Sequence, residues 1–268
     1  MIIHSVRLRR SIHGASLPLL VIAGLLLLWE ILVSINDVPM GILPPPSKIM
    51  KESFFLREQL MGHALTTITE AVVGLVLAAL LGTVVAGALA SLAILRKAFL
   101  PILVISQNIP MMILAPLIVV WFGFGIEPKI AVVTLVCFFP IAVSSADALM
   151  NADKDLLDLM KSMGASRLQV LRYVRIPQAV PSFFSGLQIA ATYAVLGAVF
   201  AEFSGGTSGL WIFIGRSQRA YRTDQVFAAV FLIAILSIVL FLLVRWMAHF
   251  STPWNRVGSG ADLREQGK

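Results

Sequence analysis

Six long apolar segments are the feature of this sequence that most constrains its fold. Each can cross a bilayer as a helix, because a hydrocarbon core of about 30 Å needs about 20 residues. Charged residues make up only 13% of the chain, whereas a soluble domain carries roughly 25%. The sequence therefore predicts an all-α, polytopic membrane protein with six transmembrane helices, over residues 17–35, 66–94, 98–123, 129–149, 183–203 and 225–248.

The first apolar segment follows a basic N-terminus, as the core of a secretory signal peptide does. Its apolar run reaches Ile35 with no A-x-A-like cleavage site after it, so we expect a retained helix. We expect a single domain, with a tail over 1–16, six helices within 17–250 and a second tail over 251–268. Between the first two segments, Pro44–Pro46 should stop one element and Ser47 should cap a short interfacial helix.

The distribution of basic residues predicts the orientation of the chain. The net charge of +7 could suggest nucleic acid, but basic residues in a membrane protein more often follow the positive-inside rule. A cytoplasmic N-terminus leaves seven of the 21 Lys and Arg residues outside, namely Lys48, Lys51, Arg57, Lys129, Arg216, Arg219 and Arg222. It places the other 14 inside, namely Arg7, Arg9, Arg10, Arg96, Lys97, Lys154, Lys161, Arg167, Arg172, Arg175, Arg245, Arg256, Arg264 and Lys268. We therefore predict that both termini are cytoplasmic and that nucleic acid is not a partner.

Small residues recur every fourth position in two of the segments. Close backbone approach at small residues drives helix packing in a bilayer, so these ladders predict packing seams. They consist of Gly74, Ala78, Gly82, Ala86 and Ala90, and of Gly186, Ala190, Ala194 and Ala198.

The longest cytoplasmic loop, about residues 150–181, contains signals for two short helices. The first, from Asp155 to Met163, should end at Gly164, which readily takes up a left-handed C-terminal conformation. Ser166 and Gln169 have the spacing of a capping box for the second. That helix has an apolar stripe of Leu168, Leu171 and Val174 and should end at Pro177. By pattern alone, this is either a solvated surface helix or a docking element for a cytoplasmic partner.

The loop resembles the signature of ABC importer permeases, the binding-protein-dependent inner-membrane subunits. That signature is E-A-A, three residues, Gly, nine residues and Ile-x-Leu-Pro. Here Asp158, Leu159 and Met160 stand in the E-A-A places. Gly164 stands in the glycine place, Val174 in the first Ile place and Ile176-Pro177 at the end. Leu159 and Met160 are larger than the family's alanines, which concerns how closely the first helix packs.

The resemblance implies that the short helix after Gly164 is the coupling helix, which sits in a groove of the ATP-binding subunit. It implies a homodimer of this chain, two cytoplasmic ABC ATPase subunits that bind ATP and Mg, an external solute-binding protein and a place in the bacterial inner membrane. The residues that carry the ATPase coupling would be Asp158, Gly164, Ala165, Ser166, Arg167, Gln169, Arg172, Ile176 and Pro177.

Three further stretches extend the resemblance to the nitrate, sulfonate, taurine and thiamine-precursor subgroup. They are LPPPSKIM, QNIPMMILAPLIVVWFGFGIEPKI and AEFSGGTSGLW. The FGFGIEPK and CFFPIAVSSADAL segments are most similar to the thiamine-precursor and riboflavin branch. We therefore expect transport of a vitamin or vitamin precursor, such as a thiamine pyrimidine precursor or riboflavin. The alternative is a sulfonate, taurine or nitrate.

The sequence offers no source of energy and no catalytic set of its own. It has no G-x-x-x-x-G-K-[ST] phosphate-binding loop and no H-E-x-x-H motif, and no histidine lies mid-span. Its one cysteine, Cys137, can form neither an internal disulfide nor a metal cluster. We expect a transport subunit that is not an enzyme and binds no cofactor.

Polar residues inside membrane segments are costly, so they are the candidates for a translocation pathway. The alternative is that Gln107 and Asn108 only satisfy backbone groups at the helix distortion. Glu202 should face a helix interface, as a structural partner or part of an outer gate, while Glu30, Glu70 and Asp147 are expected to be anchors near segment ends. The pathway candidates are Gln107, Asn108, Pro110, Gln188, Tyr193 and Glu202.

Two other classes of protein fit the sequence less well. An ion-coupled secondary transporter would show internal repeats and charged relays in mid-membrane, and neither is evident here. An intramembrane enzyme would need a catalytic set that this sequence lacks.

Overall fold

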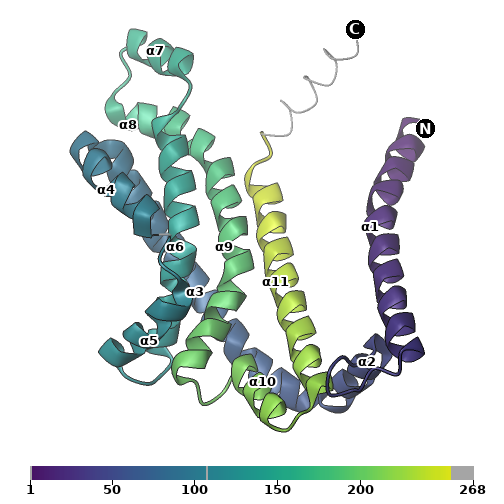
Figure 1. The fold of residues 1–268 in the computed structure, drawn as a ribbon. Coiled ribbons are helices and arrows are strands. Elements are labelled where there is room, and N and C mark those ends of the chain that lie inside the picture. Colours follow the sequence, from purple (N-terminus) through teal and green to yellow (C-terminus); the bar gives the residue numbers. More distant parts are fainter. Residues whose placement is uncertain (1, 107, 255–268) are drawn as a thin grey trace. The chain divides into compact units, whose positions relative to one another are not determined.

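The computed structural model describes residues 2–106 and 108–254, with the side chains of 2–16, 18, 19, 93, 100, 111 and 112 left aside. All regular structure in these residues is helical (Figure 1). The elements are α1 (Ile2–Ile35), α2 (Pro46–Phe55), α3 (Arg57–Ser91), α4 (Ala93–Ser106), α5 (Met111–Phe122), α6 (Glu127–Met150), α7 (Lys154–Ser162), α8 (Arg167–Val170), the π-helical segment η1 (Leu171–Arg175), α9 (Ile176–Gly205), α10 (Leu210–Arg219) and α11 (Thr223–Ser251).

Each of the six predicted segments coincides with apolar helix. Four stretches in the described part of the chain are long and apolar enough to cross a membrane, Arg57–Ser91, Glu127–Met150, Arg167–Gly205 and Thr223–Ser251. Two shorter apolar pieces, Leu20–Ile35 and Ile113–Phe122, fall in the first and third predicted segments. The all-α class is confirmed, with four helices of full spanning length.

The third predicted segment, over 98–123, is two helices rather than one. α4 ends at Ser106 and α5 begins at Met111. Pro110 stands directly before α5 in an extended conformation, with φ −62° and ψ 126°. Its ring removes one backbone donor and disfavours the helical conformation of the residue before it. The third segment is therefore two helices joined by a short break.

The chain divides into two compact units, of which the first comprises residues 1–61 and 213–231. In this unit Trp29 packs on Phe227 and Phe231, with ring centroids 5.6 and 6.1 Å apart. The Arg222 guanidinium forms ion pairs with Glu52, at 2.5 Å, and with Asp224, at 3.2 Å. These contacts hold α1, α2 and the start of α11 together.

Ser47 does not cap α2, contrary to the prediction. Pro45 occupies the N-cap position and makes no side-chain cap. The Ser47 backbone N–H and hydroxyl instead donate to the two carboxylate oxygens of Glu30, at 3.0 and 2.7 Å. An anion near a helix N-terminus is favourable, so the Glu30 carboxylate of α1 stabilises the start of α2 and accepts from one of its backbone N–H groups. Glu30 is thus an anchor, as predicted.

The second unit comprises residues 62–212 and 232–268, and α6 lies at its packing centre. A Cβ added at Gly74 would lie 2.5 Å from Val133, and one at Gly82 would lie 3.0 Å from Ile141. Both contacts join residues 59 positions apart, so α3 and α6 run in the same direction.

The ladder on α9 packs on the same central helix. A Cβ at Gly186 would lie 2.6 Å from the Pro140 carbonyl oxygen, and one at Gly197 would meet Val136 at 3.5 Å. Later residues of α9 thus meet earlier residues of α6, which makes the two helices antiparallel. The other members of both ladders are fully buried except for Ala90, which is half-buried. Both predicted packing seams are confirmed.

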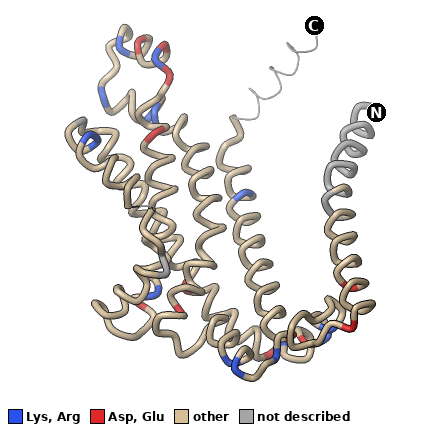
Figure 2. The backbone as a smooth tube through the Cα atoms, in the orientation of Figure 1, with Lys and Arg blue, Asp and Glu red and all other residues tan. Residues whose placement is uncertain are grey.

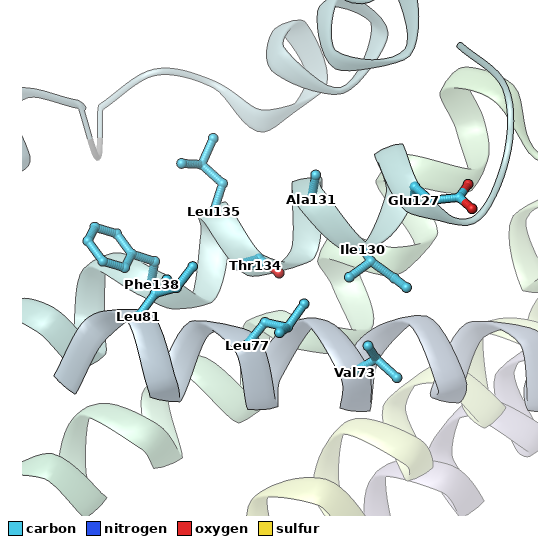
Figure 3. Close-up of a pocket in the computed structure, with 9 residues that line it drawn as sticks. All are labelled: Val73, Leu77, Leu81, Glu127, Ile130, Ala131, Thr134, Leu135 and Phe138. Atoms are coloured by element: carbon cyan, nitrogen blue, oxygen red, sulfur yellow. The ribbon is translucent and has the colours of Figure 1, made fainter. Parts of the chain in front are cut away.

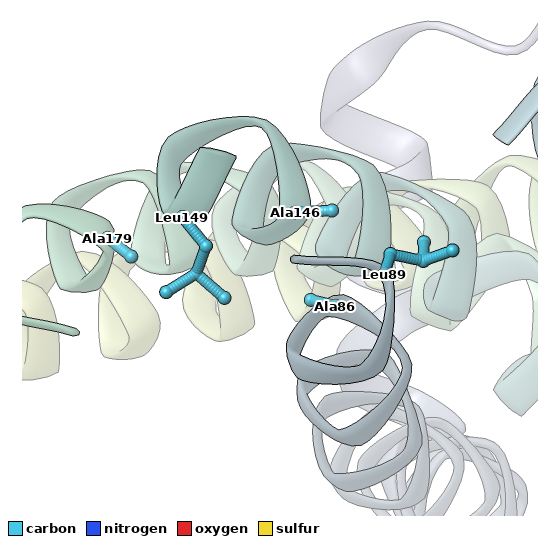
Figure 4. Packing of buried hydrophobic residues seen from close by; sticks show 5 residues of the cluster. All are labelled: Ala86, Leu89, Ala146, Leu149 and Ala179. Atoms are coloured by element: carbon cyan, nitrogen blue, oxygen red, sulfur yellow. The ribbon is translucent and has the colours of Figure 1, made fainter. Parts of the chain in front are cut away.

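A cluster of buried small and branched residues lies at the end of this unit where α6 leads to α7. Ala86 and Leu89 of α3 meet Ala146 and Leu149 of α6, together with Ala179 of α9 (Figure 4). Between α3 and α6 there is also a groove of about 690 Å³, which includes Leu77, Leu81 and Phe138 (Figure 3). Apart from Glu127 and Thr134 its lining is apolar, and such a surface suits contact with acyl chains.

The packing seam between α9 and α6 predicts different effects on stability for two glycine substitutions. Gly186→Ala should lower stability by about 2 kcal/mol, because its methyl group would meet a backbone carbonyl that cannot move aside. Gly87→Ala is the control, since nothing lies within 4 Å of a Cβ there, and it should be neutral or stabilising by up to about 1 kcal/mol. The measurement is unfolding of both purified variants in detergent. Equal stability of the two variants would contradict the seam.

Candidate functional site

The loop between α6 and α9 has the two helix boundaries that its sequence predicts. The Asp153 carboxylate caps α7 by accepting from the backbone N–H groups of Asp155 and Leu156. Gly164 has φ +74°, the left-handed conformation that glycine adopts most easily. The capping box of α8 is complete, with Ser166 N to Gln169 Oε1 at 2.7 Å and Gln169 N to Ser166 Oγ at 3.3 Å. The loop therefore turns at a defined point between two capped helices.

Pro177 does not end the second helix, which corrects the sequence prediction. α8 continues through the π-helical segment Leu171–Arg175 directly into α9. A π-turn pairs residues five apart, and Pro177 follows this turn directly, at the second residue of α9. The helix after Gly164 and the membrane-spanning helix are thus one continuous helical path. A movement of the loop would be transmitted directly to α9.

Much of the apolar surface of this loop is exposed. The exposed fractions are 55% for Leu159, 73% for Met163, 72% for Leu168 and 65% for Tyr173. Of the predicted stripe only Val174 is buried, at 6%. Leu168 points to solvent instead. The loop thus offers an apolar surface that nothing in the described chain covers.

The polar side chains of the loop are exposed as well. Arg167, Gln169 and Arg172 are exposed, Ala165 is half-buried, and Ile176 and Pro177 lie at the start of α9. Asp158 pairs with Lys161 at 2.9 Å. The hydrogen bond and charge of Lys161 hold the pKa of the Asp158 carboxyl below its usual value. The cationic residues are therefore available to a partner.

A cavity of about 610 Å³ lies at the break between α4 and α5, against α6 and α9. Of the predicted pathway residues it brings together Asn108, Pro110 and Tyr193. Gln107 lies outside the described residues, Gln188 is half-buried on α9 and does not line the cavity, and Glu202 lies elsewhere. The remaining lining residues are Ile109, Val136, Phe139, Pro140, Val143, Ser144 and Ile189.

Asn108 lines this cavity and also bonds to the end of its own helix. Its Nδ2 donates to the carbonyl oxygens of Val104 at 3.2 Å and Ile105 at 3.4 Å, which satisfies the end of α4. Its Oδ1 remains as an acceptor on the cavity wall. The two readings of this residue, as a pathway residue and as a satisfier of the broken helix, are therefore compatible.

Ser144 and Pro140 are cavity residues that the sequence prediction missed. Pro140 lies inside α6 and has no N–H, so the Val136 carbonyl lacks its usual helical donor. Val136 and Pro140 both line the cavity. The signal that could have identified these residues in the sequence is a proline inside a membrane segment that also contains polar residues. The lining contains no charged residue.

Glu202 is fully buried and belongs to a separate polar network. Its carboxylate accepts from Thr67 Oγ1 at 2.5 Å and from the Trp211 backbone N–H at 2.8 Å. Thr67 Oγ1 also accepts from the Leu210 N–H at 3.0 Å. The predicted position at a helix interface is confirmed, and the carboxylate fixes the turn over residues 206–211 to α3.

A buried ion pair lies beside this network. Lys129 Nζ and Glu70 Oε1 are 2.6 Å apart, with side-chain exposures of 7% and 0%. The sequence predicts Lys129 on the outer side and Glu70 as an anchor near a segment end, and it gives no signal that the two side chains pair. Their 59-residue separation equals that of the α3–α6 glycine contacts, which explains why they meet. Removing either partner would leave a buried charge uncompensated.

Residues 74–257 match the family described as the binding-protein-dependent transport system inner membrane component. This chain belongs to that family. It is accordingly a multi-pass inner-membrane permease component, a non-catalytic transport subunit that binds no cofactor, and its ATP is hydrolysed on a separate ATPase subunit. Membership also implies an ATPase and a solute-binding protein as partners.

Individual relatives and solved structures agree with this assignment. A probable ABC transporter permease protein of Haemophilus influenzae is 36% identical over 87% of this permease and 95% of its own length. The formylaminopyrimidine transport permease protein ThiX of Halalkalibacterium halodurans is 33% identical over 93% and 99%. The fold resembles a chain of the inward-facing MetNI methionine ABC transporter, with TM-score 0.63 and 20% identity over 72% of this permease and 96% of that chain.

The Glu202 network predicts different effects for two threonines on one helix. Thr67→Val keeps the shape but removes one of the two donors to the Glu202 carboxylate and leaves the Leu210 N–H without its acceptor, so it should lower stability by about 2 kcal/mol. Thr69, which is exposed and bonded only within α3, is the control, and Thr69→Val should cost less than about 0.5 kcal/mol. Unfolding in detergent measures both, and amide exchange at Leu210 should be faster only in Thr67→Val. Unchanged exchange there would rule out the network as the anchor of this turn.

Proposed function

We propose that this permease imports a small, neutral solute that carries hydrogen-bond donors, best matched by a vitamin or vitamin precursor such as a thiamine pyrimidine precursor. The observation that carries the proposal is the cavity at the α4–α5 break, which offers polar groups but no charge. A solute-binding protein would deliver the solute from outside. ATP binding and hydrolysis on two partner ATPase subunits would switch the helices between outward- and inward-facing states.

Six crossings fit the packing of the second unit. Because α3 and α6 run in the same direction, the chain must return once between them, and α4 with α5 would together make that crossing. α1 and α11 would add the first and last. A second copy of the chain is proposed to complete the wall of the path, and the 14-to-7 partition of basic residues supports cytoplasmic termini and a cytoplasmic α7–α8 loop.

The chemistry of the cavity supports the class of solute. Asn108 Oδ1 and the Val136 carbonyl are acceptors, and the Ser144 and Tyr193 hydroxyls can both donate and accept. A planar amino-heterocycle supplies N–H groups to such a wall and an aromatic face to Phe139. A sulfonate or nitrate presents only acceptors and would need a cation or a helix N-terminus. Sulfonate, taurine or nitrate is therefore the second candidate class.

The α7–α8 loop is the proposed docking element for the ATPase. Its exposed apolar residues and its arginines offer the groups that a helix-in-groove contact uses. The turn at Gly164 sets the direction of α8, and the continuous path into α9 would carry the movement to the cavity wall at Tyr193. The proposed coupling residues are those of the family signature, from Asp158 to Pro177.

Two substitutions at Gly164 test the docking role. Gly164→Val should weaken pull-down of the partner ATPase from detergent about tenfold, because a branched side chain disfavours φ +74° by roughly 1–2 kcal/mol. Gly164→Asn is the control, since asparagine tolerates this conformation, and it should keep most of the binding. No side chain lies within 4 Å of the Cβ position, so steric overlap would not explain a difference. Undiminished pull-down with Gly164→Val would contradict the docking role.

Uptake in cells tests the class of solute. Cells with the complete transporter should take up a labelled thiamine pyrimidine precursor saturably, and Asn108→Leu and Ser144→Ala should each lower uptake severalfold through loss of a polar contact. Thr192→Val is the control, since Thr192 bonds only to its own helix and lies outside the cavity. Saturable uptake of taurine or nitrate alone would overturn the assignment, and unchanged uptake in Asn108→Leu would remove that residue from the path.

A further inference from the structure

The apolar groove between α3 and α6 has one charged side chain, and this lies at one end. The lining residues are Val73, Leu77, Leu81, Glu127, Ile130, Ala131, Thr134, Leu135 and Phe138. Figure 3 shows Glu127 at one end of the row, with Leu81 and Phe138 at the other. The Thr134 hydroxyl already donates to the Gly74 carbonyl oxygen, at 3.3 Å. Of the described lining, the Glu127 carboxylate is therefore the polar group that is left for a ligand.

The length of the groove fits one leaflet of a bilayer. From Glu127 to Phe138, α6 rises about 16 Å at 1.5 Å per residue, which is about half of a 30 Å hydrocarbon core. Figure 2 shows charged residues near both ends of α6 and none along its middle. Glu127 therefore lies at the depth of the lipid headgroups, and Phe138 lies near the midplane. A transmembrane helix, whether α1 or one from a second copy, would run through the whole thickness, so the groove matches an acyl chain better.

The Glu127 carboxylate is available to a cation. Glu127 is exposed and forms no ion pair with any residue that the structure describes. Lys129, two positions later, is buried and paired with Glu70 at 2.6 Å. Gly125 has φ +154°, and a Cβ there would lie 2.5 Å from Glu127 Oε2, so the glycine leaves room for the carboxylate beside the loop. An uncompensated anion thus stands at the mouth of an apolar groove.

The charge at this end distinguishes among lipid headgroups. The primary ammonium group of phosphatidylethanolamine can pair with a carboxylate and also donate hydrogen bonds to it, which makes the contact stronger. The quaternary ammonium group of phosphatidylcholine carries the charge but has no N–H. Phosphatidylglycerol has a net negative charge, which the Glu127 carboxylate would repel. The groove and its carboxylate together therefore favour phosphatidylethanolamine.

We propose that the groove binds a phospholipid with a primary ammonium headgroup, of the phosphatidylethanolamine type. One acyl chain lies along α3 and α6 and covers the exposed side chains of Val73, Leu77 and Leu81, and the ammonium group contacts the Glu127 carboxylate. Because the lipid touches both helices, its binding stabilises their association. The groove shares no residue with the α4–α5 cavity or the α7–α8 loop, so the site is independent of the proposed solute and of the proposed docking role.

The test is a titration of the delipidated full chain in detergent with short-chain phosphatidylethanolamine, phosphatidylcholine and phosphatidylglycerol, followed by native mass spectrometry. Phosphatidylethanolamine should bind most tightly. Glu127→Gln should weaken its affinity about fivefold, the factor that corresponds to ~1 kcal/mol for one exposed ion pair. Glu58→Gln is the matched control, because Glu58 is also an exposed acid in the first turn of a helix but lies outside the groove. It should change the affinity less than twofold.

A second pair of variants tests the apolar part of the groove. Leu77→Trp should fill the groove and weaken binding of all three lipids severalfold, whereas Leu80→Trp, at an exposed position of the same helix outside the groove, should not.

Three results would overturn the proposal. Equal affinity of the wild type and Glu127→Gln for phosphatidylethanolamine, or equally tight binding of phosphatidylglycerol, would remove the headgroup contact. Equal affinity of Leu77→Trp and Leu80→Trp would remove the groove as the site. The same spectra report the number of copies, so loss of a dimer in Leu77→Trp with unchanged lipid binding would assign the groove to a second copy instead.

Discussion

Close packing of small residues against α6 is the constraint on which the second unit depends. Lipid tails are as apolar as leucine side chains, so helices in a bilayer associate through backbone approach and polar contacts. Gly74 and Gly186 bring α3 and α9 to α6 at distances that exclude any side chain. This contact sets the register in which Lys129 meets Glu70 and the direction in which α9 leaves the loop.

Both ends of the unit follow from that register. At one end, the buried Glu70–Lys129 pair joins α3 to α6, and the Glu202 network fixes the turn over residues 206–211. At the other, the α7–α8 loop runs without interruption into α9. The cavity lies between these ends, at the break between α4 and α5. A rigid seam flanked by a broken helix is suited to alternating access, because movement can concentrate at the break.

Local signals were the most predictable from sequence. The four-residue ladders, the Gly164 turn and the Ser166–Gln169 box needed only neighbouring residues to specify them, and all are confirmed. Errors arose where distant contacts or backbone geometry decide. The sequence predicts that Ser47 caps its own helix, since the bond from Ser47 to Glu30 spans 17 positions and no local pattern reveals it. It also predicts that Pro177 ends a helix, since a π-turn has no recognisable sequence pattern. The Glu70–Lys129 pair could not be found without the α3–α6 register.

The proposed single crossing of the membrane by α4 and α5 together would account for the common direction of α3 and α6. It is tested most directly by single cysteines at Arg96 and at Phe124, both exposed, in a chain with Cys137 replaced by serine. An impermeant thiol reagent applied to intact cells should label the cysteine at position 124 and leave that at position 96 unlabelled until the cells are opened. Labelling of both from the same side would contradict the crossing.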